Sequence, residues 1–131
     1  MNRNLALAFV DAINSHNTDN ICTLMTPNHL FIDSQGNEFE GKEFMKQAWK
    51  SYFEMFPDYR IEISRVVEND SNIVLLGSAQ GTYKNMKSDD NSMHWKVPAA
   101  FRAESSKNKI KLWQVYADNT FAFNIMNKHH D

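Results

Sequence analysis

Two aspartates at predicted strand ends are the residues of this sequence best suited to acid–base chemistry. Asp33 follows Phe31 and Ile32, at the end of a short predicted strand and before the turn-forming residues 34–37. A carboxylate beside an apolar pocket can take a proton from a carbon next to a carbonyl, provided that the pocket raises its pKa. Alternatively, the Asp33 side chain caps its own turn. Asp33 is therefore the candidate proton acceptor, with a turn-capping role as the alternative.

Asp118 is the second candidate and lies at the end of the last long predicted strand, 110–118. Alternation along a strand places Trp113, Val115 and Ala117 on one face, and Asp118 with Tyr116 on the other. If the first face lines the pocket, Asp118 points away unless a bulge re-aims it. Asp118 could instead cap the terminal segment, or lie with Tyr116 at a subunit interface.

The other reactive residues form no complete catalytic or metal-binding set. His94 and Trp95 are adjacent on a predicted strand and so point to opposite faces, with His94 outside. Cys22 is the single cysteine and is predicted to be an inert, small apolar side chain. No group of His, Cys, Asp and Glu has metal-ligand spacing, and no nucleotide-binding fingerprint occurs. We therefore predict neither a metal nor a cofactor.

Residues 42–67 carry the clearest structural signal, because their hydrophobic period changes at one point. Apolar residues between Phe44 and Phe56 recur at spacings of three and four, which predicts a helix with a broad apolar face. Pro57 ends this helix. From Tyr59 the spacing becomes two, which predicts a strand with one buried face. An aromatic helix is therefore expected to turn sharply onto a sheet.

The remaining elements predict an α+β fold. Apolar spacing indicates a helix over about 2–16, a second short helix capped by Thr18 and ended by Pro27, and a short strand at 30–33. Strands follow at 73–83, 92–104 and 110–118, separated by polar loops that include 84–91. Helices at the front of the chain would pack on one face of a strongly curved mixed or antiparallel sheet, which leaves an internal pocket.

Length and composition limit the function classes. The 131 residues are expected to form one domain, with a disordered tail at about 128–131. A formal net charge of −2 without long runs of one sign gives no electrostatic case for nucleic acid or an anionic membrane. No apolar run is long enough to span a bilayer. The single cysteine favours a reducing compartment, so we expect a cytoplasmic protein.

The order of these elements and their local motifs resembles the nuclear transport factor two-like superfamily, and within it the SnoaL-like polyketide cyclase group. The matching residues are spread over nearly the whole chain: 15–18 after the first helix, 31–33, Gly41 with Trp49 and Phe53, 56–59, Gly81 with Thr82, and 109–118. The resemblance implies a cone-shaped, ketosteroid isomerase-like fold with a pocket in its mouth, and often a homodimer through the sheet. It implies no single reaction, because one fold serves many functions.

The resemblance also suggests roles for individual residues. In ketosteroid isomerase-like relatives the general base occupies the position of Asp33, and SnoaL-like cyclases carry an acid–base aspartate that resembles Asp118. The two oxyanion donors of that isomerase fall on Phe9 and Val97, which cannot donate, so its reaction is not expected here. The predicted pocket-lining residues are Phe9, Trp49, Tyr52, Phe53, Tyr59, Trp95, Val97, Phe101, Trp113 and Val115, although the aromatic residues of the central helix are more typical of a core.

Two functions remain open from the sequence. The first is cofactor-free cyclase, isomerase or dehydratase chemistry on a hydrophobic carbonyl compound, with Asp33 as proton acceptor. The second is a non-catalytic module of the same fold that binds a small hydrophobic ligand, or that pairs with another protein through its sheet. The direction of the Asp33 side chain distinguishes them. A carboxylate in an apolar cavity favours the enzyme, whereas a carboxylate held in its own turn favours binding.

Overall fold

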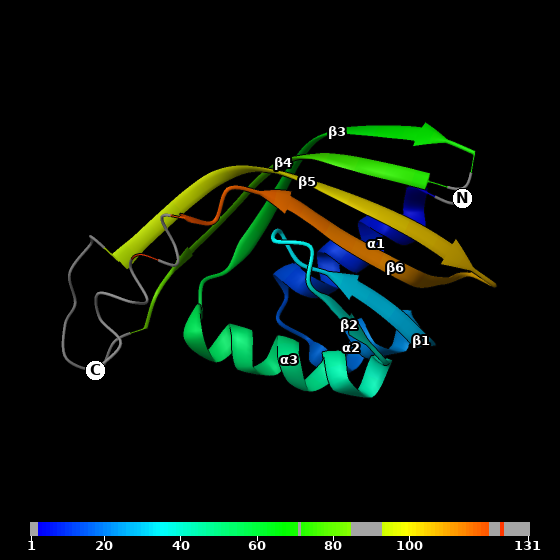
Figure 1. Cartoon of the computed structure of the whole chain (residues 1–131), viewed down its shortest axis with the longest axis horizontal. Helices are drawn as coiled ribbons and strands as arrows, with labels where there is room; N and C mark the ends of the chain where they lie inside the picture. Colours follow the sequence, from blue (N-terminus) through cyan, green and yellow to red (C-terminus); the bar gives the residue numbers. More distant parts are fainter. Residues whose placement is uncertain (1–2, 71, 85–92, 121–123, 125–131) are drawn as a thin grey trace.

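A computed structural model describes residues 3–70, 72–84, 93–120 and 124. Within these residues, three helices lie against one sheet of six strands, and the first two strands precede the third helix in the chain (Figure 1). The helices are α1 (Arg3–Asn14), α2 (Thr18–Thr23) and α3 (Lys42–Met55). The strands are β1 (Met25–Ile32), β2 (Glu38–Glu40), β3 (Arg60–Asn69), β4 (Asn72–Thr82), β5 (His94–Ser106) and β6 (Lys109–Ala117).

The strand order in the sheet is β2-β1-β6-β5-β4-β3. The β1–β6 pair is parallel and the other pairs are antiparallel, so the sheet is mixed. Figure 1 shows the sheet curving over α1 and α3, which lie against its concave side. The predicted α+β fold with helices packed on a strongly curved mixed sheet is confirmed.

The predicted change of period at residues 42–67 is confirmed as the corner between α3 and β3. Met45, Trp49 and Phe53 lie one helical turn apart and are buried. Phe56 ends the helix, and its amide donates to the Tyr52 carbonyl at 2.9 Å. Pro57 follows, and β3 begins at Arg60. This corner turns the aromatic face of α3 toward the concave side of the sheet.

The first two strands differ from the sequence prediction. The strand expected at 30–33 begins at Met25, so Pro27 lies within β1 and α2 already ends at Thr23. Asn17, rather than Thr18, is the N-cap of α2. β2 was not predicted at all. β1 is long because it pairs with β6, more than eighty residues later, and local hydrophobic spacing carries no record of that partner.

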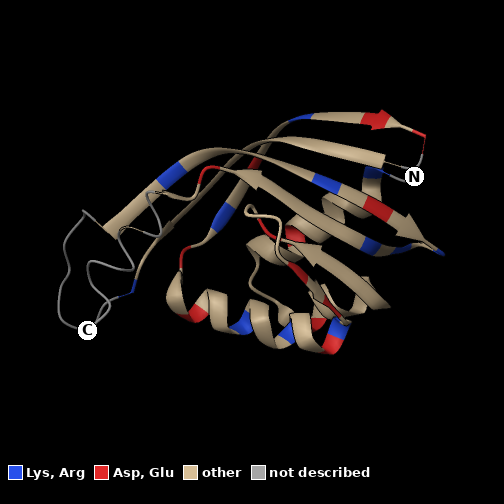
Figure 2. Cartoon of the chain, viewed as in Figure 1, with Lys and Arg blue, Asp and Glu red and all other residues tan. Residues whose placement is uncertain are grey.

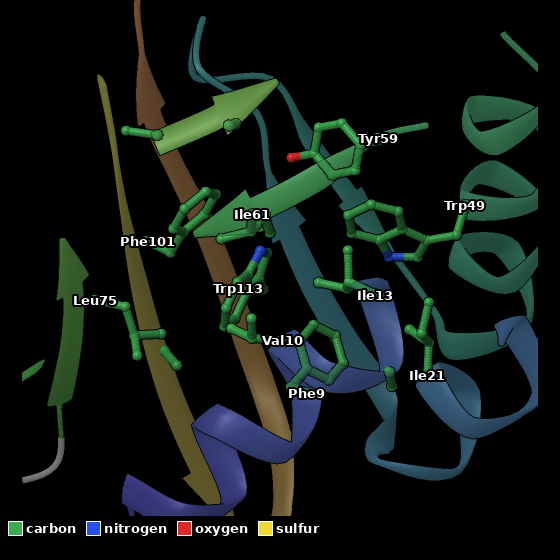
Figure 3. Packing of buried hydrophobic residues seen from close by; sticks show 14 of the residues in the cluster. Phe9, Val10, Ile13, Ile21, Trp49, Tyr59, Ile61, Leu75, Phe101 and Trp113 are labelled. Carbon is green, nitrogen blue, oxygen red and sulfur yellow. The ribbon is translucent and has the colours of Figure 1, made fainter. Parts of the chain in front are cut away.

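The central core lies where α1 meets the middle of the sheet. Phe9 of α1 contacts Trp113 of β6 at 4.8 Å between ring centroids, and Trp113 stacks on Phe101 of β5 at 5.4 Å. All three residues are 0% exposed. Figure 3 shows Ile13 and Ile61 between this group and the Trp49–Tyr59 pair. The interior therefore continues from α1 toward α3.

Charged residues are dispersed over the elements rather than collected in one region (Figure 2). No helix among the described residues is long and apolar enough to cross a membrane. Within the same residues, no group of three or more His, Cys, Asp or Glu could hold a metal ion. The predicted polar loop, apart from Lys84, and the predicted disordered tail lie outside the described residues.

Candidate functional site

A cavity of about 250 Å³ lies between α3 and the concave face of the sheet. Its helical wall consists of Met45, Ala48, Trp49 and Tyr52, and its sheet wall of Ala79, Trp95, Val115 and Ala117. Phe56 and Tyr59 of the α3–β3 corner complete the interior. Its volume is slightly below the roughly 300 Å³ at which ligand pockets commonly begin. A small organic molecule fits this space.

The rim of the cavity is the more exposed end. It is formed by Phe31, Asp33, Ser34, Phe39 and Asn119. Phe39 is 36% exposed, whereas Trp49 and Trp95 in the interior are 5% and 2% exposed. The side-chain nitrogen of Asn119 donates to the Ser34 hydroxyl at 2.9 Å. Polar groups are thus gathered at the rim, while the interior is aromatic and aliphatic.

Aromatic rings surround the interior in continuous contact. Tyr52 and Tyr59 meet edge to face at 5.0 Å between centroids, and Trp95 lies 6.1 Å from Tyr59. Trp49 lies 6.1 Å from Tyr52 and 6.4 Å from Tyr59. Phe56 closes the group against Trp95 at 5.5 Å. These contacts fix the rings against one another, so the cavity has a preformed shape.

The two tyrosines supply neutral hydroxyl groups to the cavity. Burial raises the pKa of Tyr52 and of Tyr59 above the ordinary value for a phenol. Both hydroxyls therefore stay protonated at physiological pH. A protonated phenol can both donate and accept a hydrogen bond.

Asp33 lines the rim, but its carboxylate is held by its own turn. Oδ1 accepts hydrogen bonds from the backbone amides of Gln35 and Asn37, both at 2.9 Å. Oδ2 accepts one from the side-chain nitrogen of Asn37 at 3.1 Å. The Asp33 amide also donates to the Asn37 carbonyl at 3.0 Å. This is the turn-capping geometry that the sequence left as the alternative.

Asp118, the second catalytic candidate, is not among the described residues that line the cavity. The side chain is exposed, and its Oδ1 accepts from the hydroxyl of Thr120 at 2.6 Å and from the backbone amide of Thr120 at 3.0 Å. The hydroxyl hydrogen bond, followed by the amide one, lowers the pKa of Asp118. Val115 and Ala117 line the cavity, and β6 ends at Ala117, one residue before Asp118.

The structure places five of the predicted pocket residues on the cavity wall: Trp49, Tyr52, Tyr59, Trp95 and Val115. The other five are not part of this lining and belong to the core or pack against it: Phe9, Phe53, Val97, Phe101 and Trp113. Phe101 and Trp113 share the concave face with cavity residues, but α1 covers that part of the sheet and fills the space. Phe53 stacks on His16 instead, at 4.0 Å between centroids.

Sequence reasoning missed several lining residues. Ala79 and Ala117 carry a usable signal, because both are small and alternate with outward-facing residues on their strands. Gly77 and Gly81 lie on the same face of β4 as Ala79. Gly77 is required to be a glycine for a different reason than lining the cavity. A Cβ on Gly77 would lie 1.8 Å from the Glu62 carbonyl oxygen, so that glycine permits close approach of β3. Phe39 had no signal, since β2 was not predicted.

Residues 6–113 match a protein family described as the SnoaL-like domain. No curated protein matches the sequence.

Solved structures resemble the fold at low sequence identity. A ketosteroid isomerase-like hypothetical protein from Catenulispora acidiphila, in complex with trimethylamine, is 15% identical with a TM-score of 0.81, over 97% of this chain and 95% of that one. A Shewanella denitrificans protein assigned to the SnoaL-like polyketide cyclases is 12% identical, with a TM-score of 0.77 and coverages of 98% and 95%. An epoxide hydrolase from M. tuberculosis is 11% identical, with a TM-score of 0.76 and coverages of 97% and 90%.

Proposed function

Since this chain belongs to the SnoaL-like domain family, whose fold frames a cavity here, we propose that it binds a small hydrophobic molecule between α3 and the sheet. The observation that carries this proposal is the lining itself, in which seven of the fifteen residues are aromatic. Enclosing an apolar ligand removes its surface from water, which stabilises the complex by roughly 25 cal/mol per Å² of apolar area. The trimethylamine complex of the Catenulispora protein is an instance of this fold with a small organic molecule.

Binding, rather than proton transfer, is the primary role that we assign. A general base must present a lone pair to the substrate, and the Asp33 carboxylate already accepts three hydrogen bonds within its turn. The second candidate is acid–base catalysis on a hydrophobic carbonyl compound. It is favoured by one observation, that Asp33 lines the same cavity as the protonated hydroxyls of Tyr52 and Tyr59. Such hydroxyls could stabilise a developing oxyanion.

A pair of matched variants tests ligand binding. The probe is N-phenyl-1-naphthylamine, which is neutral at pH 7 and fluoresces more strongly in apolar surroundings. Ala117→Leu enlarges a side chain on the cavity wall, whereas Ala100→Leu adds the same group to the opposite face of the neighbouring strand. We expect the probe to bind the wild type and the Ala100→Leu variant, and to bind Ala117→Leu at least about tenfold more weakly. Equal binding to both variants would place the probe elsewhere.

Asp33→Asn separates the two candidate functions. Asparagine keeps an acceptor oxygen for the turn amides but cannot take a proton from a carbon acid. If the protein only binds its ligand, a carbonyl compound that occupies the cavity should show no turnover in either form. If instead the wild type turns the compound over, and the Asp33→Asn variant still binds it but no longer turns it over, the protein is an enzyme.

We further infer that the partner of this protein is a second copy of the same chain, packed through the convex face of the sheet. Val67 and Tyr116 project from that face and are 45% and 50% exposed, so both apolar surfaces would leave water at such an interface. Tyr116→Arg should lower the sedimentation-derived mass to that of a monomer. Phe44→Arg is the control, because Phe44 is 56% exposed on α3, away from the convex face. A monomeric wild type would overturn this inference.

A further inference from the structure

We propose that the ligand of this cavity is an organic cation, either a quaternary ammonium compound or a protonated hydrophobic amine. The inference rests on the proposed binding function and narrows it to one chemical class. It follows from two features of the described lining residues: a cage of aromatic rings in the interior and one formal charge, that of Asp33, at the rim.

The aromatic cage offers ring faces and edges from several directions. Tyr52 stands nearly perpendicular to Trp49, at an interplanar angle of 87°, and to Tyr59, at 84°. Phe56 stands nearly perpendicular to Trp95, at 89°. The face of an aromatic ring carries negative charge density, so rings that differ in orientation can surround a cation. Tryptophan is the strongest of these partners, and two of the three in the chain line this cavity.

The charges of the lining favour the same ligand class. Among the described residues that line the cavity, Asp33 alone carries a formal charge at neutral pH, since Tyr52 and Tyr59 stay protonated, and none is Lys, Arg or His. A bound anion would meet a carboxylate and no cationic partner. A bound neutral hydrocarbon would displace water from the Asp33 carboxylate and would offer the carboxylate no polar partner in place of that water. A cation gains from both the ring faces and the carboxylate.

The turn that disqualifies Asp33 as a free base suits it to this electrostatic role. Three hydrogen bonds fix the carboxylate at the rim, and none of their donors, from Gln35 and Asn37, carries a charge. The negative charge of Asp33 is therefore not neutralised by an ion pair in the turn. The turn already uses three of the carboxylate's roughly four lone-pair sites, so its attraction to a cation acts mainly through space. A quaternary ammonium group, which has no N–H, is attracted through space alone.

The test uses two probes of nearly equal shape that differ in charge, phenyltrimethylammonium and tert-butylbenzene. Binding is measured by calorimetry and by the fluorescence of the cavity tryptophans. The wild type should bind the cation about tenfold more tightly than the hydrocarbon. Asp33→Asn removes the charge while keeping a turn acceptor, and should weaken binding of the cation several-fold without weakening binding of the hydrocarbon. Glu40→Gln removes a charge from the exposed β2 strand outside the cavity and should change neither.

The outcomes separate this inference from the proposed binding function. Equal affinity for the two probes, or tighter binding of the hydrocarbon, overturns the cation inference and leaves a neutral hydrophobic pocket. A cation preference that survives Asp33→Asn unchanged overturns the role of that carboxylate. If neither probe binds, the cation inference fails, and the N-phenyl-1-naphthylamine experiment decides separately whether the cavity binds ligands.

Discussion

Asn119 donates a hydrogen bond from its side-chain nitrogen to the hydroxyl oxygen of Ser34, with 2.9 Å between the two atoms. Ser34 lies in the turn after β1, and Asn119 lies beyond the end of β6. The bond therefore continues the contact between these two parallel strands past their last ladder pair, Ile32–Gln114. Because both residues line the cavity rim, this bond holds the two sides of the opening together.

Ser34→Ala should increase the rate at which a ligand leaves the cavity. The substitution removes the acceptor of the Asn119 bond, and one net hydrogen bond is worth about 1 kcal/mol, or about fivefold in rate. Stopped-flow dissociation of N-phenyl-1-naphthylamine measures the effect. Ser64→Ala is the control, since the Ser64 hydroxyl donates to the Leu76 carbonyl at 3.1 Å and does not line the cavity. Identical dissociation from Ser34→Ala and the wild type would show that the bond does not restrain the opening.

Asp33→Ala should destabilise the protein more than Asp33→Asn. Alanine leaves the amides of Gln35 and Asn37 without their side-chain acceptor, whereas asparagine keeps one acceptor oxygen. Because this turn is largely exposed to water, we expect a loss of only about 1–2 kcal/mol for the alanine variant. Urea denaturation monitored by tryptophan fluorescence gives the free energy of unfolding. Equal stability of the two variants would argue against a capping role.

His29 should make the protein less stable as the pH falls. The residue is 0% exposed, and its Nδ1–H donates to the Ile110 carbonyl at 2.8 Å, which leaves Nε2 unprotonated and without a partner. Burial lowers the pKa of His29 below the ordinary 6.5. The unfolded chain therefore takes up a proton at a higher pH than the folded protein does. The contribution of neutral His29 to stability is fully present above about pH 6.5 and is lost as the pH falls toward the folded-state pKa.

Urea denaturation at pH 7.5 and at pH 5.5 tests this expectation. His29→Asn is the matched variant, because its side-chain nitrogen can replace Nδ1 as a donor to Ile110 but does not titrate. The difference in stability between the two pH values should be smaller in this variant than in the wild type. If the stability difference between pH 7.5 and pH 5.5 is the same in His29→Asn as in the wild type, other groups cause the pH dependence.

Gly77→Ala should destabilise the protein strongly. An added Cβ would lie 1.8 Å from the carbonyl oxygen of Glu62 on β3, a backbone atom that cannot move aside without breaking the β3–β4 pairing. We expect a loss of about 3 kcal/mol, at the upper end of ordinary overpacking. Ser78→Ala is the control, because Ser78 is the next residue of β4 and points to the opposite, convex face; it should change stability little. Thermal melts give the stability of both variants. If Gly77→Ala is as stable as Ser78→Ala, β3 does not approach Gly77 as closely as the structure shows.

Local periodicity was enough to predict the α3–β3 corner and the faces of the later strands. The alternation that separates Val115 and Ala117 from Tyr116 holds in the structure, because successive side chains on a strand must point to opposite faces. The same rule placed His94 outside and Trp95 inside, and they are exposed and buried respectively. Such predictions depend only on neighbours along the chain.

Which residues line the cavity could not be predicted in the same way. Trp95 and Phe101 lie on the same face of β5, yet only Trp95 lines the cavity, because α3 stands over one end of the strand and α1 over the other. Likewise, Asp33 sits at the predicted strand end, but the choice between a free carboxylate and a capped turn depended on how residues 35–37 fold back.

The sequence by itself thus determined the helices, most strands, their buried faces and the family, since each follows from local spacing and short motifs. The tertiary structure alone decided the parallel pairing of β1 with β6, the position of β2, and the division of one continuous aromatic interior into a packed core and a cavity. The physical reason is that these features depend on contacts between segments far apart in the chain. Asn119 reaches Ser34 across 85 residues, and no local pattern encodes that distance.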